Sequence, residues 1–479
     1  MRRLGALCAV VAFASLSILP GCGKSEGPLV GGGAKGQFSL TVHDAAPVGI
    51  TVLSLQVTIQ SAFLQPGNVS VSLPQTIDLA RLQSDTTLIS SLQIPAGTYT
   101  SLVLDIENPS MIFINNTGGP VTPNDNPTCL AGAVCQITPV SLGGNPIPLS
   151  SAPVFPFQVA QNAEVGLELD LDIADLVQSD YSLNFSTGLN VTQLTSVQGA
   201  AEIRGLHHVL GTVTTLGADA FTFTTPTGMQ LGVTTNNTTK FNFPASCLTD
   251  NFACVKVNQV LELDLSLEGN GTLLATEVDL EADVNVAEIS GPIVLLDTNS
   301  PPQSFQMLVL QASPVAVANA PLGEVQTVSI GTPTTFSVDN HSFVLPAGLT
   351  FTSASSLLVG QEALADVDII LAPSLVIRTS TLALRRSQVT ALVLTAPAVN
   401  GTTFVLSPLP SIFQTALPTN ILQMTVDTTT QTTYEDLTPD TIAGVIAGNN
   451  VSVGGFLFNA AGTATIAVDA VRGQPIPGQ

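Results

Sequence analysis

The sequence predicts an all-β protein with several domains, and three observations support this fold class. Apolar and polar residues alternate with a period of two over residues 38–42, 50–59, 165–173 and 260–267, which is the pattern of half-buried strands. Val, Ile and Thr, which favour strands, are abundant. No apolar stripe with helical spacing persists beyond about two turns. A chain of 479 residues has room for about three or four domains.

The N-terminal segment has the pattern of an export signal. Arg2 and Arg3 precede an uncharged apolar run over residues 4–19, which suits a signal peptide and is short for a membrane span. The following residues, 22–36, are rich in Gly and predict a flexible tether between the signal and the first strand.

The apolar run ends in Leu19-Pro20-Gly21-Cys22. An aliphatic residue three positions before a cysteine and a small residue directly before it resemble the lipobox of bacterial lipoproteins, although Pro20 is an unusual choice there. The resemblance implies that residues 1–21 are a signal peptide and that Cys22 carries acyl chains, which anchor the protein to a membrane. A plain secretory signal with an incidental cysteine is the alternative. The expected location is the bacterial cell envelope, at the outer membrane, on its periplasmic face or at the cell surface.

Charge and composition exclude several function classes. There are 12 Lys and Arg against 35 Asp and Glu, for a formal net charge of −23, and nucleic-acid-binding proteins carry basic surfaces. No nucleic-acid partner is therefore expected. The chain has 4 His, 3 Tyr and no Trp. The motifs Gly-x-Ser-x-Gly, His-Glu-x-x-His and Gly-x-x-x-x-Gly-Lys-Ser/Thr are absent, so we predict no catalytic residues and no cofactor.

Four cysteines remain after Cys8 and Cys22 are set aside. Cys129 and Cys135 are close in sequence, as are Cys247 and Cys254, but the spacings match neither a redox C-x-x-C nor a zinc motif. Four cysteines allow three connectivities, and local pairing is the simplest of them. We predict two structural disulfides, with free buried thiols as the alternative.

Residues 37–197 form the first predicted unit. It contains Leu40-Thr-Val-His-Asp44-Ala-Ala-Pro47, Ile77-Asp-Leu79, Ile94-Pro-Ala-Gly97-Thr-Tyr99 and the strand over 168–175. These segments resemble the bacterial domain of unknown function 4382, although two alanines separate Asp44 from Pro47 where that family has one residue. The resemblance implies a β-sandwich of immunoglobulin-like or transthyretin-like type, and it implies no known activity.

A weak repeat with a period of about 80–100 residues follows. Each copy has a strand that joins threonine to an aromatic residue, as in Thr238-Thr-Lys-Phe241, Thr334-Thr-Phe336 and Thr432-Thr-Tyr434. In the last two copies Gly360 and Gly448 lead the next aliphatic strand. The copies predict three small β-barrels or compact sandwiches over residues 205–285, 286–386 and 387–473. The second is expected to carry an insertion around residues 312–323. They resemble the domain of unknown function 5666 in tandem, which implies OB-like barrels with no assigned chemistry.

An acidic stripe is the one candidate for a metal site. Glu168, Asp170 and Asp172 alternate along one strand, so their carboxylates share a face, and Asp175 follows. Oxygen ligands of this kind suit Ca²⁺, but no EF-hand glycine follows. Similar stripes recur elsewhere, which favours solvated strand faces, and we therefore predict no metal site, with Ca²⁺ at these four residues as the alternative.

These patterns together predict a non-enzymatic, lipid-anchored envelope protein with a structural, adhesive or interaction role. Its expected partners are a membrane, through the lipid, and an envelope protein or a polysaccharide. A lipoprotein that binds a glycan or a cation, or that assists transport, is the alternative, and an enzyme of unrecognised type comes third.

Overall fold

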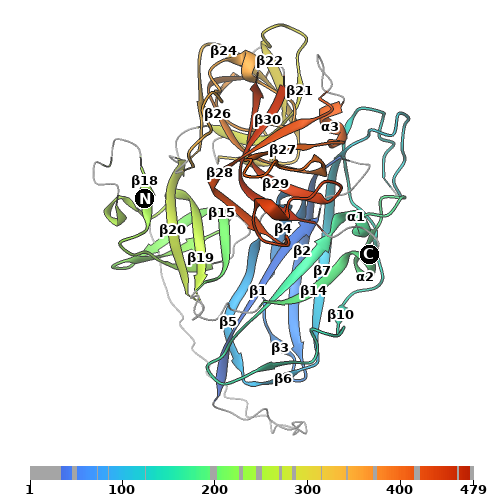
Figure 1. The fold of residues 1–479 in the computed structure, drawn as a ribbon, viewed down its shortest axis with the longest axis vertical. Helices are drawn as coiled ribbons and strands as arrows, with labels where there is room; N and C mark the ends of the chain where they lie inside the picture. The colour runs from blue at the N-terminus through green and yellow to red at the C-terminus, as the bar shows by residue number, and fades with distance from the viewer. Residues whose placement is uncertain are drawn as a thin grey trace, which may run out of the picture.

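A computed structural model defines the fold (Figure 1). It describes residues 34–45, 51–72, 74–84, 86–124, 126–194, 202–225, 230–243, 247, 251–268, 272–282, 287–313, 316–340, 343–370, 375–414, 421–460 and 463–474. Strands dominate these residues, and the helices are single turns, so the predicted all-β class is confirmed. In the described ranges no helix is both long and apolar enough to span a membrane.

The N-terminal part is a β-sandwich, which we call the sandwich. Its elements in chain order are β1 Lys35–Ala45, β2 Thr51–Gln65, β3 Val69–Ser70, β4 Gln75–Asp78, η1 Leu79–Arg81, β5 Thr87–Pro95, β6 Gly97–Tyr99, β7 Ser101–Ile114, β8 Val134–Ile137, β9 Ser141–Leu142, β10 Ile147–Leu149, β11 Phe157–Val159, β12 Glu164–Asp172, α1 Ile173–Leu176, β13 Leu183–Asn184, α2 Phe185–Gly188 and β14 Leu189–Leu194.

Two sheets form the layers of the sandwich. One has the order β14-β12-β1-β5, and the other has the order β10-β7-β2-β3 with β4 and β8 attached. Leu40 and Leu167 from the first sheet and Leu55 and Leu104 from the second are fully buried in one core cluster. The apolar positions of the alternating pattern therefore face each other across the two layers.

Three small barrels follow the sandwich. The first barrel contains β15 Glu202–Leu216, β16 Ala220–Thr224, β17 Gln230–Thr234, β18 Lys240–Asn242, η2 Phe252–Cys254, β19 Val260–Glu268 and β20 Leu273–Ala282. The second contains β21 Glu288–Leu296, β22 Ser304–Leu308, β23 Gln311–Ala312, β24 Val325–Val338, η3 Ala354–Ser356, β25 Glu362–Ile370 and β26 Val376–Thr395. The third contains β26, β27 Thr403–Leu406, α3 Ser411–Gln414, β28 Met424–Glu435, η4 Ile442–Gly444, β29 Asn450–Ala460 and β30 Thr463–Gly473.

All three barrels close in the same way. The circuits are β15-β16-β17-β20-β19, β21-β22-β24-β26-β25 and β26-β27-β28-β30-β29, each returning to its first strand. One pair in each circuit is parallel, namely β17–β20, β24–β26 and β28–β30, and the other pairs are antiparallel. A closed circuit leaves no open sheet edge, so the barrels can lie side by side without pairing edge to edge.

A threonine hydroxyl supports the parallel pair of each barrel. Thr239, Thr334 and Thr432 each precede an aromatic residue by two positions. Their Oγ1 atoms donate to carbonyls of the closing strand, at Ala275 (2.6 Å), Thr379 (3.2 Å) and Val468 (2.6 Å). The ladder is interrupted next to two of these threonines, so the hydroxyl satisfies a carbonyl that the backbone does not. The threonine–aromatic repeat in the sequence thus marks the closure of each barrel.

A residue with positive φ starts the aliphatic strand of each barrel. It is Asn258 (φ 72°) in the first barrel, Gly360 (φ 90°) in the second and Gly448 (φ 90°) in the third. The N–H of each donates at 2.8 Å to a carbonyl of the opening strand. Gly and Asn tolerate this left-handed conformation, so backbone geometry explains why each copy has one of these two residues here.

The second and third barrels share a strand. β26 pairs with β24 and β25 through its first half and with β27 and β29 through its second half. The predicted boundary between residues 386 and 387 therefore lies inside one continuous strand. The two barrels also share a single core cluster, whereas the first barrel has a cluster of its own.

Candidate functional site

One of the contacts between the barrels and the sandwich is made by a short segment that we call the docking segment, residues 79–84. Asp78, at the end of β4, accepts hydrogen bonds from the Oγ of Ser54 (2.6 Å) and the backbone N–H of Leu55 (2.9 Å). Burial raises the pKa of Asp78, and these two hydrogen bonds oppose that rise. They hold the end of β4 against β2, and η1 begins directly after it.

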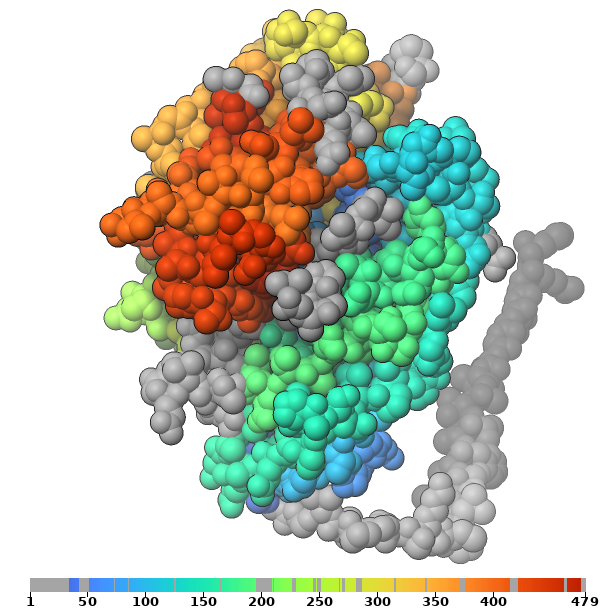
Figure 2. Space-filling model, turned by 45° about the vertical axis from the view of Figure 1, so that its right-hand side comes forward, coloured from blue at the N-terminus to red at the C-terminus, as the bar shows by residue number. Residues whose placement is uncertain are grey.

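The docking segment lies against the outer face of the third barrel. Alternate residues of β26 point to that face, and three of them contact the segment. The contacts are Arg386 Nη2 to Ser84 Oγ (3.2 Å), Gln388 Nε2 to the Arg81 carbonyl (2.7 Å) and Thr390 Oγ1 to Gln83 Oε1 (2.9 Å). Figure 2 shows the orange and red surface of the third barrel beside the cyan and green surface of the sandwich.

Basic residues, which are scarce in this chain, are concentrated between the domains. Four of the eight arginines, Arg81, Arg385, Arg386 and Arg472, each contact a residue of a neighbouring domain. Arg81 Nη1 of the sandwich lies 2.8 Å from Glu362 Oε1 of the second barrel. The few cations of an acidic protein are thus placed where they join its parts.

Arg472 is the most buried of these groups. Its side chain is 1% exposed and extends from β30 toward the sandwich. Its Nε donates to Asp436 Oδ2 at 2.7 Å, and its Nη1 donates to Thr86 Oγ1 at 3.1 Å. Its Nη2 lies 3.6 Å from Glu168 Oε1. A buried charge requires such partners, so Arg472 ties the third barrel to β12.

The acidic stripe of β12, which was expected to face solvent, is partly covered by the third barrel. Glu168 is buried beside Arg472, so the expectation of a solvated face is wrong for this residue. Asp172 caps α1 by accepting from the N–H of Ala174 at 2.8 Å, and Asp175 lies in the first turn of α1. The stripe meets an arginine because the third barrel covers this edge of the sandwich.

The other acidic stripes that the sequence predicts include Glu262, Glu277 and Asp279 in the first barrel and Asp366 and Asp368 in the second. The three residues of the first barrel are buried, which again contradicts a solvated face, whereas Asp366 is half-buried and Asp368 is exposed. Arg385 Nη1 lies 3.7 Å from Glu262 Oε2, and Asn242 donates to both Glu277 and Asp279 at 2.6 Å. Among the residues that the structure describes, no group of three or more metal-ligating side chains has the geometry of a metal site.

Asp170 gives the interface a dependence on pH. Burial, together with the nearby carboxylate of Asp172, raises the pKa of Asp170 to about 7, against the attraction of Arg472. The folded protein therefore holds a proton on Asp170 at pH values where the unfolded chain has lost it. Linkage then requires the free energy of unfolding to fall as the pH rises from about 4 to 7, and to change no further from this source above that range.

We expect Asp170→Asn, which mimics the protonated acid, to remove this contribution. The variant should be more stable than the wild type, by a margin that grows by about 2–3 kcal/mol between pH 5 and pH 8. Urea unfolding of both proteins across this range measures the difference. A constant difference between the two stability curves at every pH would contradict the prediction.

A pocket lies where the sandwich and the last two barrels meet. Its volume is about 120 Å³, and Leu53, Arg81, Pro292, Glu362, Arg386 and Phe413 are among the residues that line it. These residues come from β2, η1, β21, β25, β26 and α3. Such junctions between domains are common positions for ligand sites.

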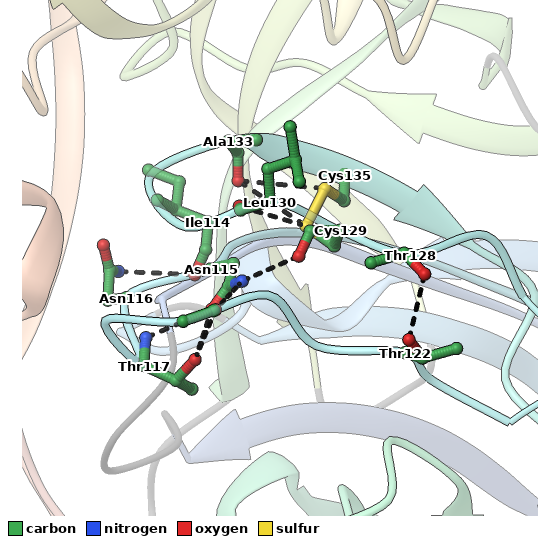
Figure 3. The surroundings of a disulfide bond; sticks show 11 residues. Ile114, Asn115, Asn116, Thr117, Thr122, Thr128, Cys129, Leu130, Ala133 and Cys135 are labelled. Carbon is green, nitrogen blue, oxygen red and sulfur yellow. Dashed lines mark hydrogen bonds between the residues drawn. A yellow bond between two sulfur atoms is a disulfide. The ribbon is translucent and has the colours of Figure 1, made fainter.

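The two predicted disulfides are present. Cys129 pairs with Cys135 in the sandwich, and Cys247 pairs with Cys254 next to η2. Figure 3 shows the first bond beside Asn115, which is fully buried. The Asn115 Nδ2 donates to the carbonyls of Gly119 (2.8 Å) and Cys129 (2.9 Å). The loop is therefore held from both sides, by a covalent bond and by a satisfied amide.

The Cys129–Cys135 loop also supports the interface. Ile114, which precedes Asn115, belongs to the core cluster of the second and third barrels, and Val134 packs against that cluster. Thr51 Oγ1 lies 2.7 Å from Ser411 Oγ of the third barrel, and Asn116 Nδ2 donates to the same hydroxyl. The disulfide thus fixes a surface on which the third barrel rests.

We expect replacement of Cys129 and Cys135 by Ala to lower the free energy of unfolding by about 2 kcal/mol, because a short closed loop restricts the unfolded chain. Urea unfolding without reductant measures the loss. The matched control is the double alanine variant at Cys247 and Cys254, which should destabilise the first barrel alone. Equal unfolding midpoints for the wild type and the Cys129/Cys135 variant would contradict the prediction.

Comparison with protein-family models matches two parts of the chain. Residues 35–194 match the model described as Domain of unknown function (DUF4382), and residues 211–279 match Domain of unknown function (DUF5666). The chain therefore contains a DUF4382 domain followed by a DUF5666 domain. The first match covers the sandwich from β1 to β14, and the second lies within the first barrel. The predicted resemblance to DUF4382 is confirmed, and the predicted resemblance to DUF5666 is confirmed for the first of the three repeats. No curated protein matches the chain.

The predicted site residues and the observed junction overlap only in part. The stripe of the DUF4382 domain supplies Glu168 and Asp170, but the docking segment and its arginine partners were not predicted. One feature of the sequence could have indicated these contacts. Lys and Arg are scarce after the signal segment and carboxylates are abundant, so each Lys or Arg is expected to form an ion pair. Cys22 lies outside the described residues.

Proposed function

We propose that this protein is a lipid-anchored component of the bacterial cell envelope with a non-enzymatic structural, adhesive or interaction role. The observation that carries the proposal is the place where the chain enters the sandwich. Lys35 begins β1 and pairs with Pro95 at the end of β5, whereas Leu88, near the start of β5, packs into the core cluster of the first barrel. At a rise of about 3.3 Å per residue, these two ends of β5 lie about 23 Å apart.

The chain therefore enters at the end of the sandwich that is remote from the barrels, which Figure 1 shows at its lower edge. Residues 22–35 could extend this end by at most about 45 Å. An acylated Cys22 would place the DUF4382 domain toward a membrane and leave the barrels on the opposite side. That arrangement suits a protein that presents its barrels to another envelope component.

Charge supports the lipid as the means of attachment. Removal of residues 1–21 takes away Arg2 and Arg3 and no acidic residue, so the net charge changes from −23 to −25. Anionic lipid head groups would repel such a surface. Two or three acyl chains give stable anchoring without any help from charge.

The contacts between domains favour a protein whose barrels are held in place for a partner, and they disfavour a chain of modules that move independently. Arg472 joins the sandwich to the third barrel, Arg81 joins it to the second, and Arg385 joins the second barrel to the first. A partner bound to any barrel would therefore be held in a defined orientation to the anchor.

The test is metabolic labelling of a bacterial culture with an alkyne analogue of palmitate. The wild-type chain is expected to incorporate the label at Cys22 and to sediment with membranes, and Cys22→Ser is expected to do neither. The matched control is Cys8→Ser, which should still be labelled because Cys8 leaves with the signal. Mass spectrometry that finds an unmodified N-terminus on the exported wild-type protein would overturn the proposal.

A further inference from the structure

The pocket at the domain junction presents two unlike walls. One wall is polar and contains the ion pair between Arg81 and Glu362, whose Nη1 and Oε1 atoms lie 2.8 Å apart. The side chains are 39% and 11% exposed, so the pair is buried on one side and reaches solvent on the other. The apolar part of the lining contains Leu53, Pro292 and Phe413.

The polar wall is held in place by its neighbours. The N–H of Glu362 donates to Ser387 Oγ at 2.9 Å, and the carbonyl of Arg81 accepts from Gln388 Nε2 at 2.7 Å. Residues of β26 therefore hold the backbone of both members of the ion pair. A site with fixed polar groups loses less entropy when a ligand binds than a flexible one does.

The apolar wall depends on a glycine. A Cβ at Gly360 would lie 2.4 Å from the ring of Phe413, so only glycine lets the ring pack this closely. Phe413 comes from α3 of the third barrel, and Gly360 comes from the second. The contact between Gly360 and Phe413 therefore depends on both barrels, whereas the ion pair depends on the sandwich and the second barrel.

We infer that this pocket binds one neutral sugar residue of a glycan. A guanidinium and a carboxylate side by side present donors next to an acceptor, which complements two adjacent hydroxyl groups that can each donate and accept. The apolar wall complements the C–H face of the ring. Two arginines line the pocket, but Arg81 is paired with Glu362 and Arg386 is paired with Asp469 at 2.8 Å. An anionic ligand is therefore disfavoured, because both cations already have a carboxylate and the chain carries a net charge of −23.

This inference names a partner class for the interaction role proposed above and rests on it. The cavity volume of about 120 Å³ accommodates a single ring with part of it in solvent, so the site would take a terminal or protruding residue of the glycan. For a ligand with about a dozen heavy atoms, a dissociation constant of about 1 mM is expected.

The experiment is saturation-transfer NMR on the full chain with Cys22→Ser, so that binding is measured independently of lipidation. The probes are the methyl glycosides of glucose, galactose, mannose and N-acetylglucosamine, with glucuronate as an anionic comparison. At least one neutral glycoside is expected to bind more tightly than glucuronate. Failure of all four neutral probes to bind would overturn the inference without bearing on the lipid anchor.

Two substitutions test the position of the site. Glu362→Gln removes the charged acceptor and keeps the size of the side chain, and Arg81→Lys keeps the charge but not the planar group. Each is expected to weaken binding at least tenfold, and the second serves if the first fails to fold. The matched control is Arg378→Gln, at an exposed residue outside the pocket, which should bind as the parent does. Undiminished binding in both pocket variants would overturn the inference.

Discussion

Replacement of Arg472 by Met is expected to lower the free energy of unfolding by about 3–5 kcal/mol and to loosen the third barrel from the DUF4382 domain. The side chain is 1% exposed and contacts Asp436, Glu435, Glu168 and Thr86. Met fills a similar volume but carries no charge. The buried carboxylate of Glu168 would then lose its cation, and such a loss costs more than the net value of the ion pair.

Scanning calorimetry measures this effect best, because several domains need not unfold together. We expect one transition of the wild type to shift to lower temperature or to split in two. Arg472→Lys should recover part of the loss, since it keeps the charge but cannot reach every partner of the planar guanidinium. Arg378→Met is the control at an exposed position, and equal losses for Arg378 and Arg472 would show that the buried contacts carry no special weight.

The second large effect is expected for Gln361→Met. Gln361 is fully buried, and its Nε2 donates to the carbonyls of Ser356 (3.1 Å) and Leu457 (2.8 Å). Its Oε1 accepts from the N–H of Leu358 at 2.7 Å. Because Leu457 belongs to β29, the amide joins the second barrel to the third. Met would leave these buried backbone groups without a partner, at a cost of about 2–4 kcal/mol.

The repeat supplies a matched control for this prediction. Gln259 occupies the equivalent position in the first barrel, where its Oε1 accepts from the N–H of Lys256 at 2.6 Å. It is only partly buried, so water can replace that hydrogen bond, and Gln259→Met should cost about 1 kcal/mol or less. Urea unfolding of the two variants gives the comparison. A loss at Gln259 as large as that at Gln361 would contradict the role of the link between barrels.

The strands and the repeat could be predicted because both depend on short stretches of chain. The alternation over residues 165–173 predicts a strand with one apolar face, and β12 occupies Glu164–Asp172 with Leu167, Leu169 and Leu171 buried. The alternation of apolar and polar residues over residues 50–59 is out of phase at Leu53 and Ser54, which predicts a bulge. The register of β2 against β7 shifts at this place, between Val52 and Ser54. The two cysteines of each pair are close in sequence, so their pairing could be predicted without knowledge of the fold.

The amino-acid sequence by itself determined the all-β class, the order of the sandwich and the repeats, and the local disulfides, because side-chain alternation and loop closure are properties of neighbouring residues. Only the tertiary structure decided which faces meet. Glu168 and Arg472 are separated by hundreds of residues, and β26 continues from the second barrel into the third without a local mark in the sequence. Contacts of that kind follow from how closed barrels pack against a sandwich, where burial of charge depends on the whole surface and no periodicity along the chain records it.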